Sequence, residues 1–135
     1  MRILFICKYN RFRSQIAEAY FRKINKNKNI EFSSAGVIAG EPIVNIVRQT
    51  AKKLGFKIKG KPKSIKESLL EKTDLVVVVA NDVPASLFKT RVKEVLAWNI
   101  PDICQGDLQD IERIERMIMK KVDELNKKLE GKKWN

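Results

Sequence analysis

The chain has 135 residues, of which 44% are hydrophobic, and its formal net charge is +12. This length and apolar content suit one compact domain with a real core and leave little room for a second. With two cysteines and no histidine, the composition excludes a disulfide scaffold, a four-thiolate zinc site and catalysis by Ser-His-Asp or Cys-His groups. The chain opens without a charged-then-apolar leader, and its longest apolar run (residues 75–80) is too short to cross a bilayer. We therefore expect a cytoplasmic protein with free thiols and no membrane partner.

The excess of positive charge attracts phosphate-bearing partners. Nucleic acid is one such partner, but the lysines are spread along the chain and few aromatic residues are interleaved with them. No stacking platform is visible, so we expect a solvated lysine-rich surface rather than a nucleic-acid interface.

Strand and helix patterns alternate along the chain. The first half predicts a strand over residues 2–6, a helix over 14–26, a short strand over 30–33 closed by Ser34-Ala35-Gly36, and a helix from Pro42 that stops at Gly55. The second half predicts a lysine-rich loop over 57–63, a short helix over 64–72, a buried strand over 75–79, one or two helical turns over 84–88, a strand over 92–98, and a helix capped by Asp107 and ended by Gly131.

Four strands separated by helices indicate right-handed crossovers. We therefore predict an α/β fold: a single three-layer domain in which helices cover both faces of a four-stranded, parallel, doubly wound sheet. In such sheets the ligand lies beyond the carboxyl ends of the strands. This rule brings Cys7, Asn81, Asp82 and Asp102 to one rim, because each follows the end of a predicted strand.

The segment from Cys7 to Ser14 carries the chemistry. A buried strand that ends in a cysteine, then a five-residue loop, then Arg-Ser at the start of a helix, is typical of a phosphate-binding loop with a nucleophile at its base. The positive electrostatic field of the loop amides and the helix N-terminus favours the thiolate form of Cys7. Ser14 can donate a hydrogen bond to that sulfur. The guanidinium of Arg13 can bind two phosphate oxygens at once.

This arrangement permits attack by sulfur on phosphorus and a covalent phosphocysteine. The leaving group then needs a proton, for which we choose Asp102, because Pro101 stiffens a loop that begins at the rim. Asp82 is the rival, although Pro84 two residues later suggests that it starts a short helix. No cluster of metal ligands is apparent, and we expect no cofactor.

These residues resemble the low-molecular-weight protein tyrosine phosphatase family, which also includes thioredoxin-coupled arsenate reductases. The likeness covers nearly the whole chain and includes the Cys-x5-Arg-Ser loop, Ser34-Ala35-Gly36, Gly40-Glu41-Pro42, the approach to the third strand at Thr73-Asp74, and an aspartate after the fourth strand. The resemblance implies one phosphatase domain over residues 1–135. Its nucleophile would be Cys7, its general acid Asp102, and its phosphate-binding loop Lys8, Tyr9, Asn10, Arg11, Phe12, Arg13 and Ser14.

The substrate implied is a phosphorylated protein, with phosphotyrosine first and phosphoarginine open, or a small phosphomonoester; we favour a monomer. Tyr9 stands where the family usually has glycine, Arg11 adds a second cation, and aromatic walls for a phosphotyrosine ring are few. Two other interpretations stay open: an arsenate reductase-like enzyme, which needs two relay cysteines where this chain adds only Cys104, and a non-catalytic module that binds phosphate or nucleic acid. Cys104 also suggests a reversible disulfide with Cys7 that protects the nucleophile.

Overall fold

The computed structural model describes residues 1–38, 40–103 and 107–131. Strands and helices alternate through most of the chain, as the sequence predicts. The strands are β1 (Arg2–Cys7), β2 (Glu31–Gly36), β3 (Leu75–Val79) and β4 (Glu94–Trp98); the helices are α1 (Arg13–Ile24), α2 (Asn45–Lys53), α3 (Glu67–Glu71), the 3₁₀ turn η1 (Ala85–Leu87) and α4 (Leu108–Glu130). No helix among the described residues has the length and apolar character that crossing a membrane requires.

The strands form one parallel sheet in the order β2-β1-β3-β4. The chain leaves β1 toward β2 on one side and later returns to place β3 on the other side. The strand order therefore reverses between β1 and β3, and their carboxyl ends flank the crevice where α/β sheets bind ligands. Cys7 is the last residue of β1 and lies at this point.

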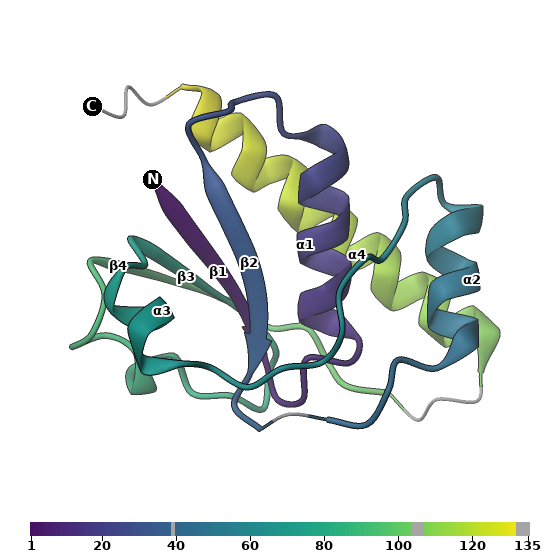
Figure 1. The fold of residues 1–135 in the computed structure, drawn as a ribbon. Coiled ribbons are helices and arrows are strands. Elements are labelled where there is room, and N and C mark those ends of the chain that lie inside the picture. Colours follow the sequence, from purple (N-terminus) through teal and green to yellow (C-terminus); the bar gives the residue numbers. More distant parts are fainter. Residues whose placement is uncertain (39, 104–106, 132–135) are drawn as a thin grey trace.

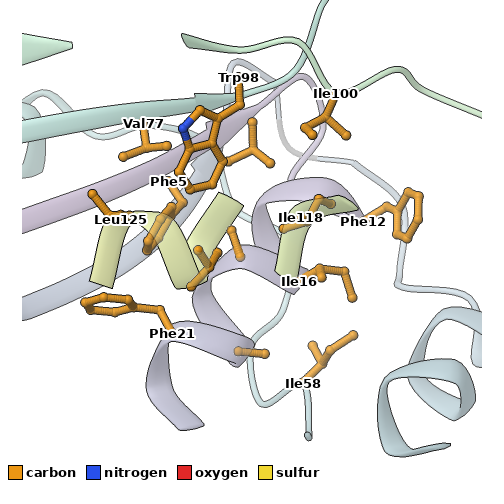
Figure 2. Packing of buried hydrophobic residues seen from close by; sticks show 14 of the residues in the cluster. Phe5, Phe12, Ile16, Phe21, Ile58, Val77, Trp98, Ile100, Ile118 and Leu125 are labelled. Carbon is orange, nitrogen blue, oxygen red and sulfur yellow. The ribbon is translucent and has the colours of Figure 1, made fainter. Parts of the chain in front are cut away.

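Side chains that alternate along each strand supply two separate cores. Ile3 and Phe5 of β1 face the layer of α1, α2 and α4, whereas Leu4 and Ile6 face the side covered by α3 and η1 (Figure 1). On the first face, Phe5 packs between Phe21 of α1 and Trp98 of β4, as Figure 2 shows. The prediction of a doubly wound α/β domain with helices on both faces is confirmed.

Two predicted helices are shorter in the structure, for identifiable reasons. The helix expected from Pro42 begins at Asn45, because the chain is still extended at Val44 and carries the side chain of Ile43 into the core. The helix expected from Ser64 begins at Glu67, because Ser64 forms a β-bridge with Gly36. By contrast, Asp107 caps α4 as predicted: its carboxylate accepts hydrogen bonds from the backbone N–H groups of Gln109 and Asp110.

Candidate active site

A loop of five residues joins the carboxyl end of β1 to the start of α1. The backbone N–H groups of residues 8–12 donate to no acceptor within the described ranges. The first turn of α1 likewise has no acidic side chain, and its N-cap residue, Phe12, offers no side-chain hydrogen bond. Free donors at the positive end of a helix dipole are an arrangement that can bind an anion, and we call this loop the cradle.

The loop keeps its shape through a set of buried polar side chains, which we call the Asn10 network: Asn10, Ser14, Gln15, Glu18 and Ser34. Asn10 is fully buried and has a left-handed backbone (φ 53°), a conformation that asparagine tolerates better than most residues. Its amide nitrogen donates to the hydroxyls of Ser14 (2.7 Å) and Ser34 (2.9 Å). Its amide oxygen accepts from Gln15 (3.0 Å) and from the backbone N–H of Lys63 (3.1 Å).

The network ends at the sulfur of Cys7. Sγ of Cys7 lies 2.9 Å from Oγ of Ser14, and only 2% of Cys7 is exposed. Because Asn10 donates to the Ser14 oxygen, the hydroxyl proton of Ser14 is free to point at the sulfur. The predicted role of Ser14 as a hydrogen-bond donor to the thiolate fits this geometry.

Arg13 lies under the loop with its guanidinium held on two sides. One terminal nitrogen donates to the backbone carbonyl of Ile100 and the other pairs with Asp82, each at 2.9 Å. The Arg13 side chain is almost fully buried, while that of Asp82 is about one-third exposed. The pairing fixes the direction of Arg13, because the carbonyl and the carboxylate belong to the ends of two neighbouring strands.

The two aspartates considered for proton transfer have different surroundings. Asp82 is engaged by Arg13, whereas Asp102 is exposed and its carboxylate accepts a local hydrogen bond from the N–H of Ile103. Cys104, the proposed disulfide partner of Cys7, lies outside the described residues.

The segment after β2 forms one wall of the cradle. Its backbone N–H groups donate to the loop, Val37 to Cys7 and Ile38 to Lys8. Gly36 makes this approach possible, because a Cβ there would lie 2.7 Å from the carbonyl carbon of Tyr9. Val37 and Ile38 are exposed beside the loop and supply an aliphatic rim.

The predicted loop residues divide into a rim and a floor. Tyr9 is exposed, with the Lys8 ammonium over its ring, and Arg11 reaches the carbonyl of Pro42. Phe12 is buried in the core and anchors the loop from below. Trp98 also belongs to the core, whereas Tyr9 is an exposed aromatic side chain at this rim.

Sequence reasoning missed the supporting residues: Gln15, Glu18, Ser34, and the pairing of Asp82 with Arg13. A polar triplet, Arg13-Ser14-Gln15, at the buried start of a helix was the available signal, since such residues are rarely buried without partners. Within the described parts of the chain, His, Cys, Asp and Glu side chains form no group of three that could hold a metal ion.

Comparison with known proteins agrees with this geometry. No curated protein sequence matches the chain. Among solved structures, a low-molecular-weight protein tyrosine phosphatase from T. tengcongensis is 27% identical (TM-score 0.82; 95% of this chain and 99% of that one covered). An arsenate reductase from Archaeoglobus fulgidus is 29% identical (TM-score 0.75; 92% and 98% covered). A YwlE arginine phosphatase, at 21% identity, shares the fold (TM-score 0.86; 98% of both chains covered).

A family model of low-molecular-weight phosphotyrosine protein phosphatases matches residues 2–134, nearly the whole chain. The expected resemblance is thereby confirmed: this chain belongs to the low-molecular-weight phosphotyrosine protein phosphatase family.

Proposed function

We propose that the chain is one phosphatase domain that hydrolyses phosphomonoesters, with a phosphorylated protein as the substrate, through a phosphocysteine on Cys7. The observation that carries this proposal is the cradle itself. A buried sulfur lies at the base of a loop whose N–H groups are free among the described residues, beside a fixed guanidinium. One solved relative, the YwlE arginine phosphatase, is a mutant whose active-site serine, introduced in place of cysteine, is phosphorylated.

In the first step, the thiolate of Cys7 attacks phosphorus and a sulfur–phosphorus bond forms as the bond from phosphorus to the leaving oxygen breaks. The loop amides and Arg13 stabilise charge on the three equatorial oxygens. Asp102, in its protonated form, gives its proton to the leaving oxygen, and the alcohol or phenol departs.

In the second step, the Asp102 carboxylate takes a proton from water as the water oxygen attacks phosphorus. The sulfur–phosphorus bond breaks, inorganic phosphate leaves, and the thiolate is restored with a hydrogen bond from Ser14. Asp82 has a positioning role in this scheme: it holds Arg13 until phosphate takes over its donors.

Turnover of p-nitrophenyl phosphate in the presence of EDTA tests the proposal. We expect the wild type to release phosphate and Cys7→Ser to be inactive, because the serine hydroxyl is a far weaker nucleophile. Equal turnover by both proteins would reject the enzyme and leave a phosphate-binding module.

The choice of proton donor has its own test. Asp102→Asn should lower kcat about 100-fold with phenyl phosphate, because its phenolate leaving group needs a proton. The loss should be smaller with p-nitrophenyl phosphate, whose leaving group departs with little protonation. Asp82→Asn should change kcat by a similar factor with both substrates, since it acts through Arg13. The reverse pattern would make Asp82 the acid.

The kind of phosphorylated residue that the enzyme accepts is a separate part of the proposal. Tyr9 and the aliphatic rim of Val37 and Ile38 can contact an aromatic ring or an extended aliphatic side chain, so both phosphotyrosine and phosphoarginine fit. Phosphate release from peptides that carry each group, compared by kcat/KM, distinguishes them. Reduction of arsenate by a thioredoxin system, measured in parallel, tests the arsenate reductase alternative.

A further inference from the structure

A row of lysines leads along the surface to the phosphate-binding loop. In the segment between α2 and α3, Lys57, Lys59, Lys61 and Lys63 are all exposed, and we call them the lysine row. Phe56 and Ile58, which alternate with the first of them, are buried. This alternation is that of an extended chain, in which alternate side chains leave the same face at intervals of about 7 Å.

The row is fixed in place at several points. Arg48 of α2 donates to the backbone carbonyls of Ile58 (3.1 Å) and Gly60 (3.4 Å). Gly60 passes so close to Gln15 that a Cβ there would lie 2.8 Å from its side-chain oxygen. The segment therefore crosses directly over the Asn10 network, beside α1 and toward the carboxyl ends of the strands (Figure 1).

At one end of the row, Lys63 is hydrogen bonded to the phosphate-binding loop. The backbone N–H of Lys63 donates to Asn10 (3.1 Å), and the carbonyl of Lys63 accepts from Gly36 (2.8 Å). At the other end, Lys57 and Lys59 line a hollow of about 550 Å³ between α1 and α2. Its other cations are Arg22, Lys23 and Lys52, and it has no acidic lining residue.

No lysine of the row forms an ion pair with any residue that the structure describes. The charges are therefore unneutralised along a path of about 20 Å that ends at the cradle. An extended peptide presents alternate side chains on one face at the same interval of about 7 Å. Aspartate or glutamate at every second position would thus meet successive lysines.

We propose that the lysine row binds an acidic, extended segment of the protein substrate, next to the phosphorylated residue held in the loop. This inference rests on the proposed function and names the kind of substrate that the site prefers. A protein partner is favoured over nucleic acid because Phe56, the aromatic residue that directly precedes the row, is buried and offers no surface on which bases could stack.

Fluorescence anisotropy tests the proposal. The probes are two labelled phosphotyrosine peptides that carry either glutamate or glutamine at alternate positions on both sides of the phosphotyrosine. The protein is Cys7→Ala, which has no nucleophile at this position and therefore cannot take up the phosphoryl group. We expect about tenfold tighter binding of the glutamate peptide at low salt, since four weak surface pairs together contribute that much. The preference should vanish in 0.5 M salt.

A matched pair of variants separates the row from net charge. Changing Lys57, Lys59, Lys61 and Lys63 to glutamine, in the same Cys7→Ala background, should make the two peptides bind equally. The control changes four exposed lysines at the end of the molecule away from the phosphate-binding loop to glutamine: Lys26, Lys28, Lys127 and Lys128. It removes the same charge and should keep most of the preference; a thermal melt of each variant checks its fold.

Three results would overturn the proposal: equal binding of the two peptides by the parent protein, an equal loss of preference in the row and control variants, or tighter binding of a labelled single-stranded oligonucleotide than of the glutamate peptide. The last would assign the row to nucleic acid. Turnover of p-nitrophenyl phosphate by the wild type is measured separately. Its absence would reject the proposed function while the binding experiment still decides whether the row recognises acidic peptides.

Discussion

Two regions of the protein bury polar side chains, but they differ in whether those side chains have hydrogen-bond partners. In the Asn10 network, the buried amide of Asn10 has hydrogen-bond partners for both its nitrogen and its oxygen, and the buried carboxylate of Glu18 accepts from Ser34 and pairs with Arg22. Glu115 on α4 is fully buried too. Neither of its carboxylate oxygens has a hydrogen-bond partner among the described residues.

Whether a buried polar side chain has hydrogen-bond partners determines how burial affects it. Burial raises the pKa of Glu115 to about 8, and the nearby charge of Glu112 adds to the effect. A buried carboxyl without partners takes up a proton, whereas buried groups that satisfy one another stay polar and hold a loop in shape. Connected polar residues therefore mark the functional region of this fold, and an isolated one marks a cost to its stability.

The largest effect is expected from breaking the network at Asn10. Asn10→Ala removes the amide oxygen that accepts from Gln15 and from the Lys63 N–H, and it places alanine in a left-handed backbone conformation. Gln15 keeps its hydrogen bond to the backbone carbonyl of residue 10. Buried groups left unpartnered and this strain together cost on the order of 5 kcal/mol of unfolding free energy. The loop amides also lose their alignment, so kcat should fall at least about 100-fold. Urea unfolding and p-nitrophenyl phosphate turnover measure the two effects.

Asn25→Ala is the matched control for this variant. Asn25 also bonds through its side chain, but it exchanges its hydrogen bonds with Asn27 in an exposed turn. Water can replace these bonds, so the loss should stay under about 1 kcal/mol and activity should not change. Similar losses in the two variants would show that the network contributes no more than a surface turn.

Replacing the unpartnered carboxyl of Glu115 should increase stability. Between the ordinary glutamate pKa of 4.5 and about 8, the folded state holds a proton that the unfolded state has released. Folding therefore becomes less favourable as the pH rises through this window. Glu115→Met removes the cost and should raise the unfolding free energy at pH 9 by on the order of 3 kcal/mol, with little change at pH 4.

Unfolding curves collected at several pH values check this prediction, with Glu124→Met as the control. Glu124 is exposed on the same helix and lies 3.9 Å from Lys121, so its replacement should change stability by less than about 0.5 kcal/mol. A loss of stability in Glu115→Met that is the same at every pH would mean that the carboxyl has partners and belongs with the connected type of site.

Much of the fold was predictable because its signals are local. Residues 75–79 form a continuous apolar run that is β-branched from Val76 onward, which indicates a strand covered on both faces, and the structure confirms it. The start of α2 was not predictable in this way. Pro42 suits a first helical position, but the demand of the core for Ile43 keeps the chain extended until Asn45. A tertiary contact outweighed a local preference.

The candidate site likewise has a part that local sequence predicts and a part that depends on tertiary contacts. Cys7, Arg13 and Ser14 lie within eight residues, so their spacing alone predicts a cradle. The contacts of Ser34 with Asn10 and of Asp82 with Arg13 join residues that are 24 and 69 positions apart, and only the sheet topology brings them together. Glu115 carried a visible signal: it is a charged residue beside Ile111, Ile114 and Ile118 on the apolar face of a predicted helix.

The two causes of the raised pKa of Glu115, burial and the charge of Glu112, can be separated by a substitution with a small expected effect. Hydrogen bonds from Lys53 and Arg116 lower the pKa of Glu112, so it is ionised while Glu115 titrates. Glu112→Gln removes that negative charge but leaves Glu115 buried. The pKa of Glu115 should therefore fall from about 8 by less than about one unit, because burial is the larger cause. Carbon-detected NMR titration of the Glu115 carboxyl measures the shift, with the exposed Glu130→Gln as the control. A return to the ordinary glutamate pKa would mean that repulsion by Glu112, rather than burial, keeps Glu115 protonated.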